Sequence, residues 1–270
     1  MVSEPPKSAP TPAKNLIKGL QILTMIAERD EGLSLSEVSR LSGVPKPTAH
    51  RLINVLLECG MIRSGPKDRY LVGPQCLILG NRFLNGLDLR QEAQDLLRKL
   101  ARDTLETCHL GIKEGTRIVY IEKVESPHAV RMYSRVGATN PVHSTALGRA
   151  ILAYCGEDTV EAVIDSGLEC RTPNTITDPN RFRANLAEIK ERGFAVDDVE
   201  NEEGIRCVAA PVFDHSGDVV AGISVSGPEQ RITKDRLNDL GIKVVEAAFA
   251  LSQRLGYESD GKWDVRSVSG

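Results

Sequence analysis

One short stretch near the start of the chain concentrates side chains that donate and accept hydrogen bonds. At the helical period of 3.6 residues they share one face of a helix. They are Lys46, Thr48, His50, Arg51 and Asn54. Guanidinium, amide and hydroxyl groups on one helix face can pair with the base edges that the major groove of DNA exposes. The pattern therefore predicts a helix that binds double-stranded DNA.

The residues around this stretch predict a helix-turn-helix that would present it. Ser34, followed three residues later by Glu37, is a capping-box pattern that begins a first helix. Gly43 suits the turn that ends it. Pro45–Pro47 suit the first turn of a second helix, where a missing N–H costs little, and Gly60 marks its end. The buried face of the second helix is expected at Ala49, Leu52, Ile53, Leu56 and Leu57.

Two short strands are expected after the second helix, at Met61–Arg63 and Arg69–Val72. This hairpin would be the wing of a winged helix-turn-helix, with Lys67 and Arg69 as basic residues near its tip. The alternative is a helical hairpin that only packs inward. The polar face of the second helix argues against that alternative, because such a face is costly to bury.

Charge is unevenly distributed along the chain. The whole sequence has a formal net charge of −3, which argues against a general polyanion binder. Residues 14–75, however, hold nine Lys and Arg against six Asp and Glu, a net charge of +3. So modest a charge favours weak DNA binding by one copy. We therefore expect a homodimer, or a dimer of dimers, on a pseudo-palindromic operator.

The pattern of the chain changes after residue 74. Residues 75–107 are rich in leucine and are expected to be helical throughout, with a kink near Gly86; the leucines would pack inward or form a dimer seam. Strands are then expected at 108–114, 117–124, 129–135, 194–198, 205–214 and 219–227. Helices are expected at 144–155, 157–166, 178–193 and 233–257, with a loop at 136–143. This order predicts an α+β domain on a largely antiparallel sheet.

The beginning of the helix expected at 144–155 could hold an anion. Its first residues, Ser144-Thr145-Ala146-Leu147-Gly148, have mostly small side chains. Backbone N–H groups at a helix start lack partners and lie at the positive end of the helix dipole. The segment therefore suits a carboxylate ligand; the alternative is close packing alone.

Three stretches together resemble the IclR family of bacterial transcriptional regulators, over about residues 14–257. They are SLSEVSRLSGVPKPTAHRLI, PVHSTALGRAILA and EGIRCVAAPVFDHSGDVVAGISVSGP. The resemblance implies a winged helix-turn-helix, a GAF/profilin-like effector domain, dimers that pair into tetramers, and a small organic acid as the effector of a regulator of catabolic genes. The expected organisation is a disordered tail (1–13), DNA-binding domain (14–75), linker helix (76–90), effector-binding and oligomerisation domain (91–258) and disordered tail (259–270).

The resemblance also implies the lining of an effector pocket. The residues at the matching positions are Met132, Ala146, Leu147, Asp197, Cys207, Ser224 and Ser226. Ser224 and Ser226 alternate on one expected strand and therefore face the same side. Where some relatives carry Gly-Ala at the helix start, this chain has Ala146-Leu147, and the bulkier Leu147 is expected to shrink or reshape the pocket.

Other residues invite a catalytic or metal-binding interpretation. His143 is expected to be a hydrogen-bond partner rather than a zinc ligand, and Cys207 a small buried hydrophobe rather than a nucleophile. The acidic run at 197–203 lacks the spacing of a calcium loop and is expected to be a solvated loop. We therefore expect no metal, no cofactor and no enzymatic activity.

Composition narrows the remaining classes of function. The six cysteines are scattered without a CxxC pair, which fits reduced thiols in the cytoplasm. No apolar run approaches the ~18 residues of a membrane span, so no membrane partner is expected. Two alternatives stay open: a GAF-fold thiol-dependent reductase, and an architectural DNA-binding protein without an effector. The wide spacing of the cysteines argues against the first, and the large second domain argues against the second.

Overall fold

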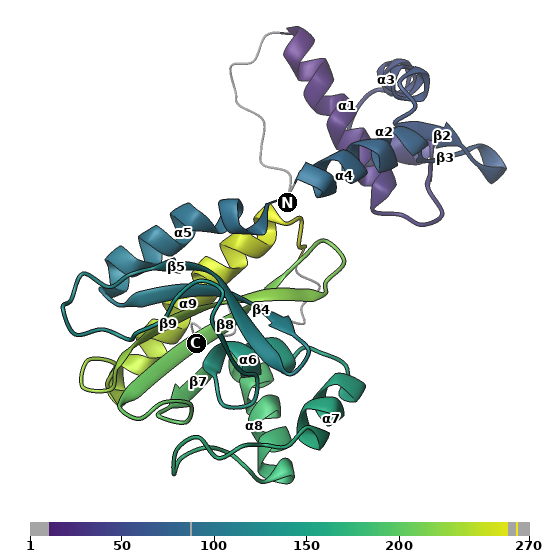
Figure 1. Ribbon diagram of the computed structural model, residues 1–270. Helices are drawn as coiled ribbons and strands as arrows, with labels where there is room; N and C mark the ends of the chain where they lie inside the picture. Colours follow the sequence, from purple (N-terminus) through teal and green to yellow (C-terminus); the bar gives the residue numbers. More distant parts are fainter. Residues whose placement is uncertain (1–10, 87, 259–262, 264–270) are drawn as a thin grey trace. The chain divides into compact units, whose positions relative to one another are not determined.

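The computed structural model of the protein describes residues 11–86, 88–258 and 263. The chain divides into two compact units, Met1–Leu87 and Asp88–Gly270, which can be followed by colour along the chain in Figure 1. Each unit has its own sheet and its own buried core. The α+β class predicted from the sequence is confirmed.

The first unit is a winged helix-turn-helix. Its helices are α1 (Thr11–Ala27), α2 (Leu35–Ser42), α3 (Lys46–Glu58) and α4 (Pro74–Gly86). Its strands are β1 (Leu33–Ser34), β2 (Ile62–Ser64) and β3 (Arg69–Val72), and a 3-10 turn at Pro66–Asp68 joins the last two. α3 packs on α1 and α2 around a core that includes Ile22, Val38 and Ile53, all fully buried. This core fixes the orientation of the outer face of α3.

Local sequence explains where α2 and α3 begin and end. The Ser34 N–H donates to Glu37 Oε2 (2.8 Å) and the Glu37 N–H donates to Ser34 Oγ (3.4 Å), which completes the predicted capping box. Gly43 closes α2 with φ +67°, a left-handed conformation that favours glycine. Pro45 is the N-cap of α3 and Cys59 its C-cap, so the predicted second helix is confirmed.

The wing contains one strand that the sequence analysis missed. β1 pairs with β3 through Leu33↔Tyr70 and Ser34↔Arg69, so the sheet has the order β1-β3-β2 instead of being a two-stranded hairpin. A strand of two residues is too short to show an alternating pattern, and only its distant partner reveals it.

The second unit is built on a six-stranded antiparallel sheet. Its strands are β4 (Thr107–Glu114), β5 (Arg117–Val124), β6 (Thr139–Pro141), β7 (Ala195–Asp198), β8 (Ile205–Phe213) and β9 (Val219–Pro228). Its helices are α5 (Leu89–Thr104), α6 (Ala146–Leu152), α7 (Glu157–Asp165), α8 (Pro179–Arg192) and α9 (Leu237–Arg254). The strand order is β6-β5-β4-β9-β8-β7, so β7 lies at one edge.

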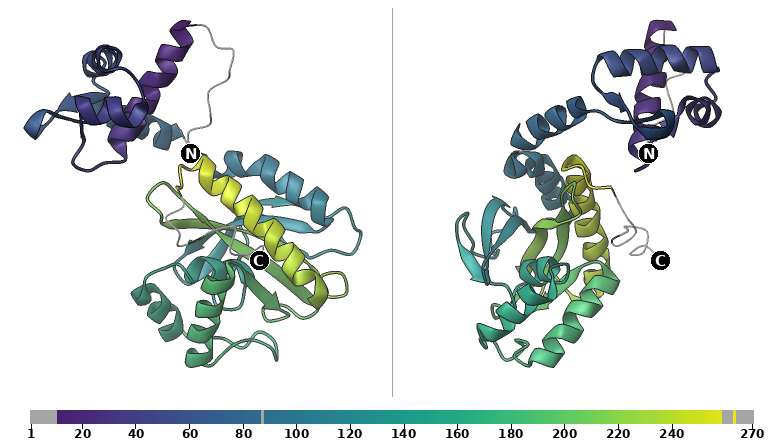
Figure 2. Two further views of the ribbon diagram at one scale, coloured as in Figure 1. Left: turned by 180° about the vertical axis from the view of Figure 1, so that it is seen from behind. Right: turned by 90° about the vertical axis from the view of Figure 1, so that its right-hand side faces the viewer.

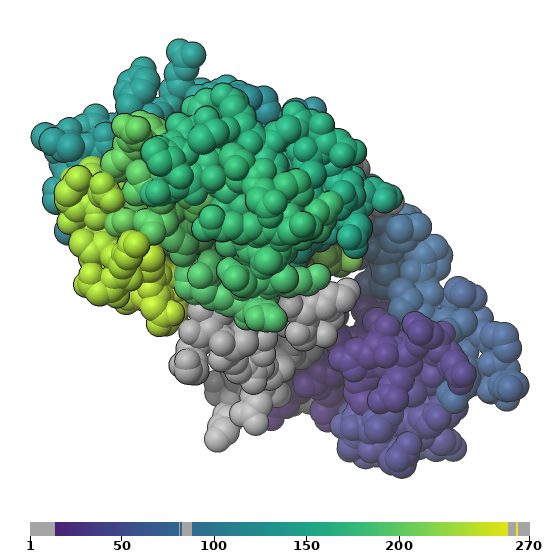
Figure 3. All heavy atoms as spheres, turned by 90° about the horizontal axis from the view of Figure 1, so that it is seen from below, coloured from purple at the N-terminus to yellow at the C-terminus, as the bar shows by residue number. Residues whose placement is uncertain are grey.

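Helices cover both faces of this sheet (Figure 2). α5 and α9 pack against each other and on β4, β8 and β9. On the other face, α6 packs over Cys207 and Ala209 of β8, and α8 packs against α6. The segment from α7 to α8 forms a continuous outer surface there, teal to green in Figure 3. α6 is thus held between the sheet and α8.

The predicted linker helix and the first helix of the second domain are α4 and α5, and the predicted kink near Gly86 is the end of one helix. Asp88 Oδ1 accepts the Arg90 and Gln91 N–H groups (3.0 and 3.3 Å) and so caps α5 as a new helix. Two predicted elements of the second unit need correction. Residues 129–135 form no strand, because the free edge of β5 is taken by β6 within the predicted loop at 136–143. The helix expected at 144–155 is shortened to α6, which Thr145 caps.

The predicted disordered tails fall mostly on residues 1–10, 259–262 and 264–270, which lie outside the described residues. Of the remaining tail positions, Thr11 begins α1. Trp263 is buried: its Nε1 donates to the Gly193 carbonyl (3.1 Å) and its ring lies against Phe213 and Phe249.

The capping box gives a stability prediction. Ser34→Ala leaves the Glu37 N–H without its acceptor and is expected to lower the free energy of unfolding of the first unit by about 1 kcal/mol. Thermal unfolding of the full chain followed by circular dichroism measures this change. Ser64→Ala, an exposed serine on β2, is the control and is expected to change it by less than about 0.5 kcal/mol. Equal effects of the two substitutions would contradict the stabilising role of the box.

Candidate functional site

The outer face of α3 carries the side chains predicted to bind DNA. Lys46, His50, Arg51 and Asn54 are exposed, and Thr48 is half-buried. The opposite face holds Ala49, Ile53 and Leu56 in the core. α3 thus has one buried apolar face and one exposed polar face, as a helix that enters a DNA groove requires, and the polar face is free to contact base edges.

The wing places its two predicted basic residues differently. Lys67 is exposed at the turn, with φ 56°. Arg69 instead lies against α2: its Nη1 is 2.9 Å from Glu37 Oε2 and 3.2 Å from the Gly32 carbonyl. Arg69 therefore braces the wing against the capping box of α2, and its contact with DNA stays a prediction.

All seven residues that the family resemblance implies line one small cavity in the second unit. Met132 comes from the irregular segment after β5, and Ala146 and Leu147 come from the start of α6. Asp197, Cys207, Ser224 and Ser226 come from β7, β8 and β9. The register Asp197↔Cys207↔Ser226 puts one residue of each strand in a row. Residues far apart in the chain thus converge on one place.

Thr145, which the sequence analysis placed in the helix start that could hold an anion, also lines the cavity. Three further lining residues were missed by the sequence analysis: Tyr120, Asn201 and Ile205. Tyr120 had a usable signal, because Ile118, Tyr120 and Glu122 alternate on β5 with more exposed neighbours. Asn201 had none, since it reaches the cavity through a loop and accepts a hydrogen bond from Ser144 Oγ (2.9 Å).

A buried histidine that the sequence analysis also missed supports the serine side of the cavity. His109 Nδ1 lies 3.5 Å from Ser224 Oγ, and His109 Nε2 lies 2.7 Å from Ser134 Oγ. Its ring lies 4.6 Å from that of Tyr120. Complete burial lowers the pKa of His109 to about 3, so the ring is neutral near pH 7. His109 therefore orients Ser224 without adding a charge.

Asp197 is the titratable side chain of the cavity. Its Oδ1 accepts the backbone N–H groups of Glu200 (2.7 Å) and Asn201 (3.3 Å). Burial raises the pKa of Asp197 to about 7, against the lowering effect of Arg149 and of these hydrogen bonds. The carboxyl group thus changes its charge within the physiological pH range.

The start of α6 is packed closely into the cavity wall. Thr145 Oγ1 accepts the Gly148 N–H (3.1 Å), which leaves the Ala146 and Leu147 amides as the first free donors. A Cβ at Gly148 would lie 2.1 Å from the Val142 carbonyl oxygen, so only glycine fits there. Leu147 reaches toward Gly222, where an added Cβ would lie 2.8 Å from its Cδ2.

The cavity is nearly filled by its own side chains. The space that water can reach is about 10 Å³, close to the minimum for one water molecule. The small volume is consistent with the bulk of Leu147, and the effect of this residue on the pocket stays a prediction. A ligand larger than water requires movement of lining side chains, and Met132 lies in an irregular segment that could supply it.

The residues considered for metal or thiol chemistry are otherwise engaged. His143 Nε2 lies 2.9 Å from the Glu169 carbonyl, and burial lowers the pKa of His143. Burial raises the pKa of the Cys207 thiol well above its ordinary value, which keeps it protonated. Within the described residues, no three His, Cys, Asp or Glu side chains lie together as a metal site would require.

The expectation of a solvated acidic loop at 197–203 is wrong for its inner residues. Asp197 and Glu200 are 2% and 7% exposed, because backbone amides and the guanidinium of Arg149 compensate their carboxylates. The sequence carried no sign of this, since Arg149 lies on a distant helix. No helix within the described part of the chain is long and apolar enough to cross a membrane.

Family models match both units. Residues 16–66 match the IclR helix-turn-helix domain, and residues 81–253 match the bacterial transcriptional regulator IclR C-terminal domain. Escherichia coli XynR is 36% identical over 242 residues, which are 89% of this chain and 96% of XynR. The Salmonella typhimurium acetate operon repressor is 33% identical over 247 residues, which are 90% of each protein. Both are curated relatives of nearly the same length.

Solved structures agree with these matches. The repressor BlcR of Agobacterium tumefaciens superposes with a TM-score of 0.79 at 27% identity, covering 90% of this chain and 97% of BlcR. The IclR protein of Thermotoga maritima superposes with a TM-score of 0.61 at 35% identity, covering 91% of this chain and all of that one. The chain belongs to the IclR family of DNA-binding bacterial transcriptional regulators, which are not enzymes.

Proposed function

We propose that this regulator senses a small organic acid through the cavity beneath α6 and controls catabolic genes. The observation that carries the proposal is the convergence of Ser224, Ser226 and the free amides at the start of α6 on one buried cavity. Hydroxyl and amide donors suit a carboxylate. Met132, Leu147 and Cys207 offer an apolar surface for the body of the ligand.

Two further features support a small acid. The cavity holds about one water before any side chain moves, which favours a compact ligand. One relative is named an acetate operon repressor, which associates a homologous protein with genes for a small acid.

The six free cysteines support a reducing compartment such as the cytoplasm.

The DNA side of the proposal rests on α3 and the wing. Arg51 lies on the exposed face of α3, one turn after Thr48, so both side chains can enter one major groove. Lys46, His50 and Asn54 extend this surface. Lys67 at the wing would contact phosphate and contribute affinity that is independent of sequence.

A homodimer, or a dimer of dimers, would present two such surfaces to a pseudo-palindromic operator. Three apolar side chains on the linker helix α4 support an association surface: Leu77, Ile78 and Leu79 are 67%, 45% and 47% exposed. Exposed leucine and isoleucine side chains grouped on one turn of a helix are costly in water and typical of an interface. Effector binding would alter operator affinity only if the ligand prefers one arrangement of the DNA-binding domains.

A thiol-dependent reductase fits the site less well. Its chemistry needs an accessible thiolate, whereas burial raises the pKa of Cys108, Cys155 and Cys207. An architectural DNA-binding protein without an effector would have no use for a cavity lined by a carboxyl group with a raised pKa and two serines.

Substitutions in the first unit test DNA recognition. Arg51→Ala is expected to cost ~1–3 kcal/mol per half-site and to relax base preference, if its guanidinium pairs with guanine. Lys67→Ala is expected to weaken selected and random DNA alike and to flatten the dependence of affinity on salt. Both are measured by titrating a DNA fragment selected in vitro by the unmodified protein. Arg98→Ala, in the second unit, is the control and should not change DNA affinity. If Arg51→Ala loses the same affinity for selected and for random DNA, Arg51 contacts only phosphate.

Substitution of Ser224 tests the effector cavity. Ser224→Leu fills the space above β9 and is expected to abolish the response of DNA binding to the organic acid that acts on the unmodified protein. DNA affinity without acid should stay within about twofold, since the first unit is unchanged. Ser216→Leu, in the exposed hairpin before β9, controls for added apolar bulk. A normal response of the Ser224→Leu protein would show that the effector binds elsewhere.

The pKa of Asp197 predicts a pH dependence of acid binding. As the pH rises through about 7, Asp197 becomes a carboxylate and repels the anionic ligand, so affinity is expected to fall. Asp197→Asn removes this charge, so its affinity for the acid should change little between pH 6 and pH 8, the range on either side of a pKa of about 7. Calorimetric titration at the two pH values measures the effect. If the affinity of Asp197→Asn falls with rising pH as much as that of the unmodified protein, another group causes the pH dependence.

A further inference from the structure

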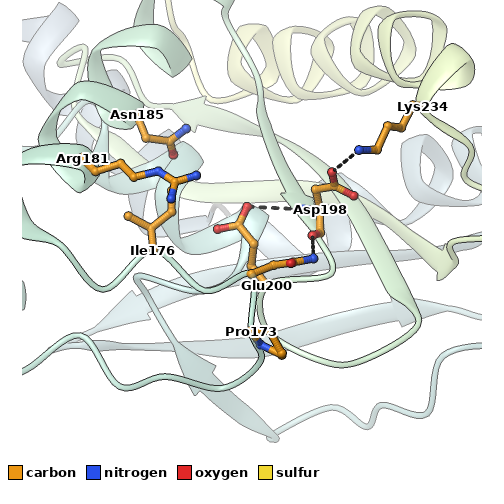
Figure 4. A pocket seen from close by; sticks show the side chains of 8 residues that line it. Pro173, Ile176, Arg181, Asn185, Asp198, Glu200 and Lys234 are labelled. Atoms are coloured by element: carbon orange, nitrogen blue, oxygen red, sulfur yellow. Dashed lines mark hydrogen bonds and ion pairs between the residues drawn. The ribbon is translucent and has the colours of Figure 1, made fainter.

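A second cavity lies on the other side of the β7 edge from the effector cavity. It offers about 420 Å³ to water and is lined by Pro173, Asn174, Ile176, Arg181, Asn185, Asp198, Glu200 and Lys234 (Figure 4). Asp197 and Asp198 are neighbours on β7 and point to opposite sides, so the strand separates the two cavities. We call this second cavity the outer cleft.

Most charges in the outer cleft are already compensated. Asp198 Oδ1 accepts a hydrogen bond from Arg206 Nε (2.7 Å), and Asp198 Oδ2 lies 3.1 Å from Lys234 Nζ. Asn174 Nδ2 donates to the Asp198 carbonyl (3.1 Å). Asp198 and Lys234 therefore stabilise the wall of the cleft, and their charged groups already have partners in the protein.

Two groups in the outer cleft remain without partners. Glu200 is 7% exposed; its Oε1 accepts from Arg149 Nη2 (2.6 Å) and from the Asp198 N–H (3.3 Å), but its buried Oε2 has no partner among the described residues. Arg181 is exposed, and no described residue pairs with its guanidinium. Figure 4 shows both side chains directed into the same space. A buried acceptor without a donor is costly and indicates a missing partner.

We infer that the outer cleft is a second ligand site that binds a small hydroxy acid, with the carboxylate on Arg181 and a hydroxyl donating to Glu200 Oε2. The hydroxyl is preferred to an ammonium group because Arg149 already balances the charge of Glu200, and an added cation would face Arg181 and Lys234. Asn185 holds Arg149 through its Oδ1 (2.8 Å), so its amide nitrogen can donate to the ligand.

The site would be coupled to the effector cavity through one loop. The Glu200 and Asn201 amides hold Asp197 in the effector cavity, while the Glu200 side chain faces the outer cleft. Thr172 and Thr175 clamp the same loop by donating to the Val199 and Glu200 carbonyls (2.7 and 2.6 Å). A ligand on Glu200 would therefore restrain the residues that position Asp197.

The test is calorimetric titration of the full chain with D-glycerate and three matched probes. Propionate lacks the hydroxyls, glycerol lacks the carboxylate, and D-serine replaces the 2-hydroxyl with an ammonium group at the same configuration. Glycerate is expected to bind at least about tenfold more tightly than each of these, the effect of one charge-assisted hydrogen bond. Equal or tighter binding of any of the three probes, or no binding of glycerate, would overturn the assignment.

Variants locate the bound glycerate. Arg181→Gln is expected to weaken glycerate binding at least about tenfold. Arg183→Gln is the control, because it removes the same charge two residues away, where Arg183 pairs with Glu161 outside the cleft. It should change the affinity for glycerate less than about twofold. Ser224→Leu should also leave it unchanged. Loss of binding in Ser224→Leu but not in Arg181→Gln would move the ligand to the effector cavity and overturn the proposal.

Hydrogen exchange provides a readout that does not depend on affinity. Glycerate is expected to slow exchange of the Glu200 and Asn201 amides in the unmodified protein and to leave it unchanged in Arg181→Gln at the same concentration. Glu200 itself is left intact, because removing one partner of a buried ion pair destabilises the fold. Equal slowing in both proteins would contradict a site that includes Arg181.

Discussion

The buried ion pair between Arg149 and Glu200 is the interaction on which the second unit depends. Arg149 is fully buried on α6, its Nη2 lies 2.6 Å from Glu200 Oε1, and Asn185 and the Val196 carbonyl accept its other hydrogen bonds. Two charges taken out of water are favourable only when such partners are supplied. One guanidinium therefore ties α6, α8, β7 and the loop after β7 together. Those elements carry the first backbone amides of α6 and Asp197, so the pair fixes the geometry of the cavity proposed to bind the effector.

The same pair gives two neighbouring carboxyl groups different roles. Asp197 accepts two backbone amides but has no cation in direct contact, and burial raises its pKa to about 7. Glu200 contacts the guanidinium directly through its Oε1. One strand edge thus holds a carboxyl group with a raised pKa on its inner side and an ion-paired carboxyl group on its outer side. The unpartnered Arg149 Nε and Glu200 Oε2 indicate that the pair is not fully satisfied within the described residues.

The sequence predicted what depends on local spacing and on motifs that resemble a known family, and missed what depends on distant partners. The capping box at Ser34 and Glu37, the helix from Asp178 to Gly193, and the long strands of the second sheet all follow from patterns within a few residues. β1 exists only because Tyr70 and Arg69 lie beside it. The buried state of Glu200 likewise depends on Arg149, 51 residues away. The ion pair between Arg69 and Glu37, 32 residues apart, was likewise not predicted from the sequence.

The small size of the effector cavity bears on how sensing reaches DNA. A preformed pocket would bind a ligand without changing shape, and a ligand with equal affinity for two conformations shifts neither. This cavity holds about one water, so any larger acid must displace side chains that line it, and Met132 is one of these. Met132 is buried while its neighbours Arg131 and Tyr133 are exposed, and Lys123 Nζ ties the segment to β5 at the Ser134 carbonyl (2.7 Å). Opening the cavity would therefore move a surface segment, so under the proposed function part of the binding free energy would appear as a change at the surface of the second unit.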